Sequence, residues 1–229
     1  MGPAFSAFSL QPVQEAAEGI FFALRRGGRR GGQCTPDPGQ SGPGPGNVCL
    51  LAFFIQVRRL TQDVIARLYD RGIKAAVIAC NTATSAAIGP LRAAFPDIPV
   101  IGIEPALKPA VAHHRRVLVL ATPLTLREEK FAALMQQCAG CAEITPLPCP
   151  ELVEFVERGE LDSPALTAYL ARQLGPYAGR VDAAVLGCTH FPFARRAIRA
   201  ALGGAAALYD GSDGTARETL RQLVRRGWV

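Results

Sequence analysis

The chain has 229 residues, of which 49% are hydrophobic, and its formal net charge at pH 7 is +6. This length and apolar content are sufficient for one large hydrophobic core or two small ones, whereas no uninterrupted apolar run reaches the roughly 18 residues of a membrane-spanning helix. The positive charge is spread over separate arginine pairs, without a clustered basic face or interleaved aromatic residues. We therefore expect neither a nucleic-acid partner nor a membrane partner.

The N-terminus and the cysteine content indicate the cellular compartment. The first residues lack the basic head and the small-residue cleavage site of a secretory signal peptide, which predicts a cytoplasmic protein. The seven cysteines are odd in number and have no regular spacing. In a cytoplasmic chain they are expected to be reduced thiols, each of which is judged separately as a core residue, a metal ligand or a nucleophile.

Residues 1–56 differ in composition from the rest and are treated as an atypical N-terminal segment. Glycine and proline make up more than half of residues 27–47, which predicts a loop or a disordered stretch. An Arg-Arg-Gly-Gly repeat at 25–32 leaves RNA contact as an alternative, although a solvated segment is favoured. Residues 11–24 fit one helix, and the apolar run 48–55 is short enough to be a buried strand.

Strands and helices are expected to alternate from residue 60 onward. This alternation predicts an α/β fold with parallel sheets and helices on both faces, in which ligands bind at the carboxyl ends of the strands. The expected strands are 75–79, 99–103, 117–120, 183–186 and 206–209. The expected helices are 60–71, 84–94, 125–137 with a capping box of Thr125 and Glu128, 151–157, 163–174, 193–202 and 215–226.

Two segments of the chain, 74–82 and 182–190, resemble each other. In both, an apolar strand ends in a cysteine, and polar residues follow at once: Asn81 and Thr82 after Cys80, and Thr189 and His190 after Cys188. Their separation is roughly one small α/β domain. The similarity of the two segments predicts two pseudo-symmetric lobes with an active site between them. One lobe comprises residues 57–98 and 208–229, and the other comprises residues 99–207.

A matched pair of cysteines at strand ends suggests acid/base chemistry. Backbone N–H groups and a helix N-terminus beside each sulfur are expected to lower the pKa of the thiol. Two thiols on opposite sides of one substrate suit racemisation, since one removes a proton and the other returns a proton to the opposite face. For either cysteine alone, a small apolar core residue is the favoured interpretation. The pairing reverses that preference.

Further motifs connect the chain to a known family. Residues 79–83, Ala-Cys-Asn-Thr-Ala, and residues 187–192, Gly-Cys-Thr-His-Phe-Pro, resemble the two signature motifs of the glutamate racemase family. Residues 102–105, 149–157 and 209–217 are also similar to the family, so the resemblance covers about 60–229. It implies interconversion of L- and D-glutamate, supply of D-glutamate for peptidoglycan in cell wall biogenesis and cell shape, no cofactor, and a homodimer as a frequent assembly.

The resemblance also implies a role for individual residues. Each thiol deprotonates one enantiomer, His190 assists Cys188, and an acid after the Cys-Pro motif, Glu157 or Glu154 one turn earlier, supports the second thiol. Aspartate racemases usually carry Glu where this chain has His190, which favours glutamate. The implied catalytic residues are Cys80, Cys188, His190 and Glu157. The implied substrate-binding residues are Asn81, Thr82 and Thr189, and no metal site is implied.

The chain departs from the family at its start. The family opens with a strand ending in Asp-Ser-Gly, whose Asp assists the first thiol, and later has a Pro-Tyr-Gly loop. Neither motif occurs here. We therefore interpret residues 1–56 as a non-homologous replacement and expect racemisation to be slow or absent. An aspartate- or hydantoin-type racemase and a catalytically impaired ligand-binding homologue are the alternatives.

Other conspicuous residues have structural interpretations. Cys138 and Cys141 form half of a possible zinc site, but no second pair stands at a suitable spacing. His113 and His114 precede two arginines and are expected at a solvated helix end.

Overall fold

A computed structural model describes residues 45–229, which divide into two compact units, one ending at Ile73 and one spanning Lys74–Val229. The described part of the first unit is helix α2 (Pro45–Tyr69). The turn that follows the helix contains Gly72, whose φ of 77° lies in the left-handed region that glycine adopts without steric cost, and whose N–H donates to the carbonyl of Tyr69. Among residues 45–229, no helix is long and apolar enough to span a membrane.

The extent of α2 corrects three expectations. The predicted strand at 48–55 is helical, and so are residues 45–47, which were expected to be a loop. The helix also runs through residue 56 without a break, so the N-terminal segment does not end there. A short apolar run has no periodicity that distinguishes a strand from part of a longer helix. The predicted helix 11–24 and the arginine–glycine repeat lie outside the described residues.

The second unit contains two sheets, and every strand pair in them is parallel. The smaller sheet consists of β1 (Ala76–Ile78) and β2 (Val100–Gly102), with Ala76 paired to Val100. Helix α3 (Asn81–Ala94) connects these strands and packs on them through its buried face. The Thr84 hydroxyl on that face donates to the carbonyl of Ile78. Strand β1, the turn at Cys80 and helix α3 thus form one βα unit.

The larger sheet has four strands in the order β4-β3-β5-β6. They are β3 (Arg116–Ala121), β4 (Glu143–Pro148), β5 (Ala183–Leu186) and β6 (Ala207–Asp210). Since successive side chains of a strand point to opposite faces, β3 and β5 supply two apolar layers. One layer packs with Leu107, Phe131 and Leu134 and includes Val117, Val119 and Val185. The other packs with Leu152, Tyr169 and Ile198 and includes Leu118, Leu120 and Leu186.

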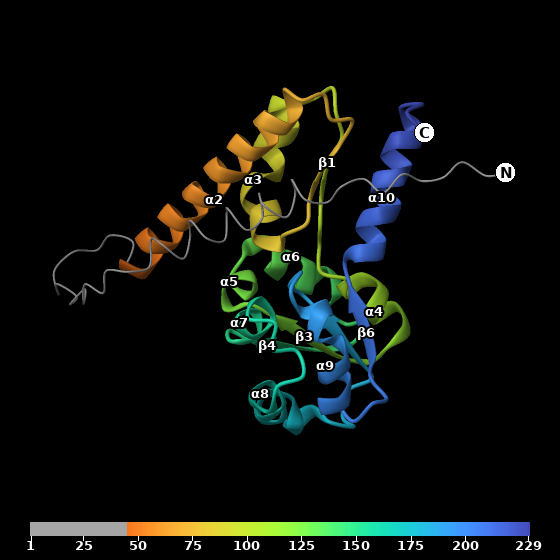
Figure 1. The fold of residues 1–229 in the computed structure, drawn as a ribbon. Helices are drawn as coiled ribbons and strands as arrows, with labels where there is room; N and C mark the ends of the chain where they lie inside the picture. The colour runs from red at the N-terminus through yellow and green to blue at the C-terminus, as the bar shows by residue number, and fades with distance from the viewer. Residues whose placement is uncertain (1–44) are drawn as a thin grey trace. The chain divides into compact units, whose positions relative to one another are not determined.

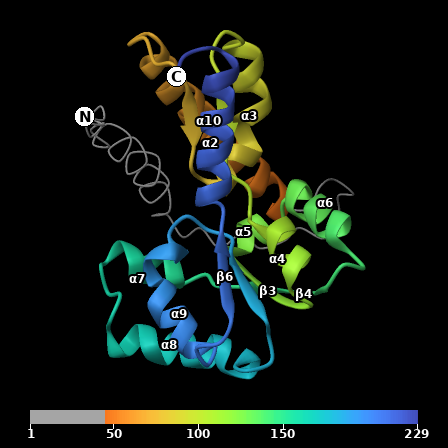
Figure 2. The same ribbon diagram turned by 90° about the vertical axis from the view of Figure 1, so that its right-hand side faces the viewer.

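Helices cover both faces of the larger sheet (Figures 1 and 2). On one side lie α4 (Leu107–His113), α5 (Pro123–Leu126) and α6 (Glu129–Cys138). On the other lie α7 (Leu152–Glu157), α8 (Pro164–Leu174) and α9 (Arg195–Ala201), with short 3-10 helices η1 (Gly175–Tyr177) and η2 (Phe191–Ala194). Helix α10 (Ser212–Arg225) follows β6 and contacts β2. The α/β class with parallel sheets is confirmed.

Local differences from the expected elements have physical causes. Strand β4 was missed because it contains Pro146 and Pro148, which a strand tolerates at the end of a sheet where β4 lies. The predicted capping box is wrong: Thr122, not Thr125, caps a short helix with Pro123 at its first position. A separate helix then begins at Glu129. The predicted Ser163 cap is confirmed, since its hydroxyl accepts from the N–H of Leu166.

The strand pairings depart from the expected lobe boundaries. Strand β2 pairs with β1, although a boundary after residue 98 places them in different lobes. Strand β6 pairs with β5, although 208–229 were assigned to lobe one. Sequence order does not reveal which strands exchange hydrogen bonds. The division into two lobes and its boundaries stay predictions.

Candidate functional site

Both cysteines lie just beyond the carboxyl end of a parallel strand. Cys80 follows β1 as the N-cap residue of α3, and Cys188 follows β5 shortly before η2. The Asn81 Nδ2 donates a hydrogen bond of 2.8 Å to the carbonyl of Gly187. Because Asn81 follows one cysteine and Gly187 precedes the other, this bond joins the two cysteine turns.

Gly187 permits a close approach between the second turn and β3. Its N–H donates to the carbonyl of Leu120 at 2.7 Å. A Cβ atom at this position would lie 2.8 Å from that carbonyl oxygen and 3.1 Å from the Cβ of Ala121. Any larger residue would push the turn away from β3, and with it the carbonyl that Asn81 binds.

Cys80 is an exposed residue. Desolvation raises the pKa of Cys80 above its usual 9.0, and the charge of Glu128 raises it further. The backbone N–H groups of Ala83 and Thr82, in the first turn of α3, lower the pKa but do not outweigh desolvation. The thiol therefore rests in its protonated form at neutral pH.

Cys188 is half-buried, and its pKa is set by the same opposing effects of burial and backbone N–H groups. Burial raises the pKa of its thiol to about 11, and the nearby charge of Cys80 adds to the rise. The backbone N–H groups of His190, Phe191 and Thr189 lower the pKa. The expected N–H groups are thus present at both thiols, but the prediction of a lowered pKa is wrong because desolvation is larger.

His190 lies next to Cys188, and Glu157 lies next to His190. The Nδ1 atom of His190 lies 3.7 Å from the Cys188 sulfur, and its Nε2 atom lies 3.6 Å from Oε1 of Glu157. Burial lowers the pKa of His190, whereas Glu157 raises it. Glu154 instead lies 3.5 Å from Arg158. Of the two candidate acids, the geometry favours Glu157.

The predicted substrate-binding residues surround the same two turns. The Asn81 Oδ1 atom is buried and has no hydrogen-bond partner among the described residues. Thr82 and Thr189 are half-buried, and each places its backbone N–H beside a thiol. The structure therefore brings together all seven residues predicted for the site.

One buried acidic residue near these turns is not among the residues predicted for the site. Glu128, expected only as part of a capping box, is 7% exposed, and its charge contributes to the raised pKa of Cys80. Burial raises the pKa of this carboxyl to about 7. No sequence signal distinguishes it from the neighbouring Glu129, which is exposed. Only the packing of the α5–α6 junction near α3 places it here.

The remaining cysteines and histidines form no site in the described part of the chain. No three His, Cys, Asp or Glu residues among positions 45–229 are arranged to hold a metal ion. Cys138 is a buried free thiol and Cys141 an exposed one. His113 ends α4 and is exposed, whereas the Nε2 atom of His114 lies 3.0 Å from the Tyr209 hydroxyl.

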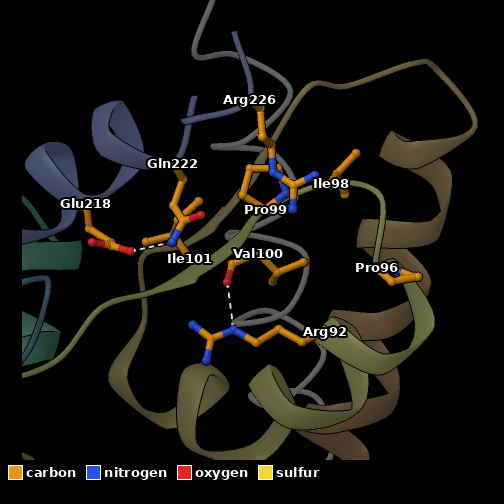
Figure 3. A pocket seen from close by; sticks show the side chains of 9 residues that line it. All are labelled: Arg92, Pro96, Ile98, Pro99, Val100, Ile101, Glu218, Gln222 and Arg226. Carbon is orange, nitrogen blue, oxygen red and sulfur yellow. Dashed lines mark hydrogen bonds between the residues drawn. The ribbon is translucent and has the colours of Figure 1, made fainter. Parts of the chain in front are cut away.

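A cavity of about 500 Å³ lies apart from the cysteine turns, between β2, the end of α3 and α10 (Figure 3). Its polar side chains bond within the protein: Arg92 Nε donates to the Val100 carbonyl, and Gln222 Nε2 donates to Glu218 (Figure 3). Arg226 donates to the Asp97 carbonyl. The cavity contains none of the predicted site residues.

Comparison with known proteins identifies the family. The family model described as Asp/Glu/Hydantoin racemase matches residues 56–219, which is well over half of the chain. The chain belongs to this family. The matched range contains both cysteine turns, His190 and Glu157.

Individual relatives share this similarity. The chain is 48% identical over 171 residues to a glutamate racemase of Clostridium perfringens, covering 73% of this chain and 66% of that protein. It is 45% identical over 173 residues to a glutamate racemase of Clostridium novyi, covering 74% and 67%. The chain thus spans about two thirds of the length of the curated relatives that it matches.

Solved structures give the same family and fold. A crystal structure of Escherichia coli glutamate racemase, in complex with L-glutamate and an activator, matches with a TM-score of 0.69 and 30% identity over 75% of this chain and 66% of that one. A Thermus thermophilus glutamate racemase, in complex with β-chloro-D-alanine, matches with a TM-score of 0.64 and 30% identity, covering 93% of this chain and 78% of that one.

Proposed function

We propose that this protein is a racemase that interconverts L- and D-glutamate by proton transfer between two thiols, without a cofactor. The observation that carries the proposal is the hydrogen bond from Asn81 to Gly187, because it joins the turns that present Cys80 and Cys188. The identity to glutamate racemases and the L-glutamate bound in the Escherichia coli glutamate racemase structure support glutamate as the substrate.

In the proposed reaction, one cysteine as thiolate removes the α-hydrogen of the bound amino acid. The other cysteine, as thiol, donates its proton to the opposite face of the same carbon. The products are the other enantiomer and a pair of cysteines with exchanged protonation states. The raised pKa of each thiol suits this cycle, because a thiolate with a high pKa is a stronger base towards a weakly acidic carbon.

The predicted binding residues suit an amino acid between the turns. The Asn81 Oδ1 atom is a buried acceptor without a partner among the described residues, and a substrate ammonium group is the donor that we assign to it. The N–H groups of Thr82 and Thr189 and the hydroxyls of both residues are donors that suit a carboxylate. Donors in these positions also stabilise negative charge that develops during deprotonation.

His190 and Glu157 are proposed to serve the Cys188 half of the reaction. The imidazole stands between the Cys188 sulfur and the Glu157 carboxylate, so it can accept the thiol proton while the carboxylate stabilises the resulting imidazolium. Burial alone lowers the pKa of His190 and would disfavour that imidazolium. Glu157 opposes this effect.

The biological role follows from the proposed product. D-Glutamate is proposed to enter peptidoglycan, which links the enzyme to cell wall biogenesis and cell shape. The cytoplasmic location and the homodimer stay predictions.

One sequence observation favours a second candidate, a ligand-binding homologue with impaired catalysis. The chain lacks the Asp-Ser-Gly motif that opens the family, in which the Asp assists the first thiol. Such a homologue would be stabilised by glutamate without exchanging its α-hydrogen. An aspartate- or hydantoin-type racemase would exchange its own substrate faster than glutamate.

Loss of the α-hydrogen signal in heavy water, followed by proton NMR for L- and D-glutamate separately, tests the proposal. We expect exchange from both enantiomers, and we expect Cys80→Ser and Cys188→Ser each to slow it by about 10²- to 10⁴-fold for the enantiomer that the lost thiol deprotonates. Cys141→Ser is the control, because this exposed cysteine lies outside the site. Exchange that is absent from the folded wild-type protein, or unaffected by both site variants, would refute the proposal.

A further inference from the structure

An ion pair between Arg195 and Asp210 follows the Cys188 turn and is not used by the proposed reaction. Arg195 is the first residue of α9, and Asp210 is the last residue of β6. The guanidinium donates from Nη2 to Oδ2 of Asp210, and from Nη1 to the carbonyl of Leu208 at 3.2 Å. The side chain of Asp210 is 14% exposed and that of Arg195 is 38% exposed. Water and salt therefore screen this pair less than a fully exposed one.

The carboxylate of Asp210 has a second partner at the start of α10. Its Oδ1 atom accepts a hydrogen bond of 2.9 Å from the N–H of Ser212, the first residue of that helix. Desolvation raises the pKa of Asp210, but hydrogen bonds from Ser212 and Arg195 outweigh it and keep the pKa below its ordinary value. The pair therefore keeps both of its charges at neutral pH.

Both ends of the Cys188 turn are anchored to the larger sheet by directed hydrogen bonds. At its start, the N–H of Gly187 donates to the carbonyl of Leu120 in β3. At its end, Arg195 bonds to the last residue of β6. Asp210 lies in register with Leu186, the last residue of β5, so this second anchor is at the edge of the sheet from which the cysteine turn begins.

The backbone between the two anchors is held mostly by local bonds. The N–H of Phe191 donates to the carbonyl of Cys188, and the N–H of Phe193 donates to the carbonyl of His190, both at 3.1 Å. These bonds shape the turn but do not link it to a strand. The buried ring of Phe191 also holds the turn, although apolar contacts are not directional. The orientation of the turn therefore depends on its anchors, of which Arg195 is the one at its end.

We propose that Arg195 and Asp210 are positioning residues for the Cys188 half of the reaction. By fixing the start of α9 to the end of β6, the pair keeps the imidazole of His190 between the Cys188 sulfur and the Glu157 carboxylate. This inference rests on the proposed function of these residues. The imidazole lies 3.7 Å from the sulfur and 3.6 Å from the carboxylate, so a displacement of about 1 Å would separate it from one of them.

The next residue along the chain provides a matched control. Arg196 forms an ion pair with Asp162, and the two side chains are 84% and 73% exposed. An exposed pair of this kind contributes little. Arg196→Met therefore removes an arginine and an ion pair from the same helix while leaving the anchor between α9 and β6 in place.

Hydrogen–deuterium exchange of the backbone, measured by mass spectrometry over residues 187–195, tests the position of the turn directly. Arg195→Met keeps an unbranched side chain but removes both hydrogen bonds, so the amides of Phe191 and Phe193 should exchange about ten-fold faster than in the wild type. Residues 117–121 of β3 should be unchanged, as should residues 187–195 in Arg196→Met. Unchanged exchange over residues 187–195 in Arg195→Met would overturn the proposal.

Loss of the α-hydrogen of glutamate in heavy water tests the consequence for the reaction. Cys188→Ser identifies the enantiomer whose exchange depends on Cys188. For that enantiomer Arg195→Met should slow exchange by about ten- to a hundred-fold, and for the other enantiomer by less than about three-fold. A pair that only stabilises the fold would slow both equally, and equal losses would therefore overturn the proposal.

Two milder variants keep the test decisive if Arg195→Met does not fold. Arg195→Lys keeps the positive charge but lacks the second nitrogen that reaches the Leu208 carbonyl, and Asp210→Asn keeps an acceptor for the Ser212 N–H without the charge. Each should show the same two changes to a smaller extent. Wild-type behaviour in both variants would overturn the proposal.

The two measurements fail separately. If the wild type exchanges the α-hydrogen of neither enantiomer, the proposed function fails, while the backbone exchange still decides whether Arg195 holds the turn. If the wild type is active and Arg195→Met leaves both measurements unchanged, the role of Arg195 and Asp210 fails and the proposed function stands.

Discussion

The Cys80 and Cys188 turns have similar sequences but different structural support. Cys188 follows β5, which pairs with β3 on one side and β6 on the other. Cys80 follows β1, which among the described strands pairs with β2. The residues of β5 are all buried, whereas Val77 in the middle of β1 is 39% exposed. A repeated local motif therefore does not guarantee equal rigidity, because neighbouring strands and helices supply the packing.

The acid/base neighbours of the two thiols also differ in origin. Cys188 has His190 two residues away in sequence, backed by Glu157 at the end of α7. Cys80 has no histidine beside it in sequence, and its titrating neighbour is Glu128 from the α5–α6 junction. In the proposed reaction, the two halves therefore respond to different mutations and to different pH ranges.

The largest expected difference concerns the stability of the two sheets. Leu118→Ala, at a fully buried position of β3, should lower the free energy of unfolding by about 2–5 kcal/mol, because it leaves a cavity in the larger core. Val77→Ala, at a partly exposed position of β1, should cost less than about 1 kcal/mol. Urea denaturation measures both values. Equal losses would show that the smaller sheet is as tightly packed as the larger one.

Burial of Glu128 makes the free energy of unfolding depend on pH. The pKa of Glu128 is about 7 in the folded protein, whereas the ordinary value for a glutamate, which applies to the unfolded chain, is 4.5. Between these two pH values the folded state therefore binds more protons than the unfolded state. Stability should therefore fall as pH rises from 4.5 through about 7, by at most about 3 kcal/mol from this group. The glutamine of Glu128→Gln cannot ionise. The stability of this variant relative to the wild type should therefore be higher at pH 8 than at pH 5.

Thermal melts of the wild type, Glu128→Gln and Glu129→Gln at these two pH values measure the effect. Glu129→Gln should follow the wild type at both, since Glu129 is exposed. A difference between the wild type and Glu128→Gln that is the same at pH 5 and pH 8 would mean that the carboxyl ionises normally.

The smallest expected effect concerns the acid behind His190. Glu157→Gln should slow exchange of the enantiomer that depends on Cys188 by about ten-fold, because it removes the charge that raises the pKa of His190. Glu154→Gln is the matched control, since Glu154 pairs with Arg158 instead. Heavy-water NMR on both variants measures the rates. A larger loss in Glu154→Gln would reassign the assisting acid.

Much of the local structure was predictable because it depends on neighbouring residues. Ser163 followed by Pro164 predicted the start of α8, and the apolar runs 117–120 and 183–186 predicted the two central strands of the larger sheet. The apolar run 48–55 failed as a strand because its helical continuation lies in the residues that follow it. Strand β4 was missed because its prolines are compatible with a strand only at the end of a sheet.

The sequence by itself determined the family motifs, both cysteines and the polar residues beside them, because these residues are adjacent along the chain. It also predicted His190 as the neighbour of Cys188. Only the tertiary structure decided that Asn81 bonds to Gly187, that Glu157 faces His190 in place of Glu154, and that Glu128 is buried. These contacts join segments far apart in the chain, and they depend on strand pairing and helix packing, which no local pattern encodes.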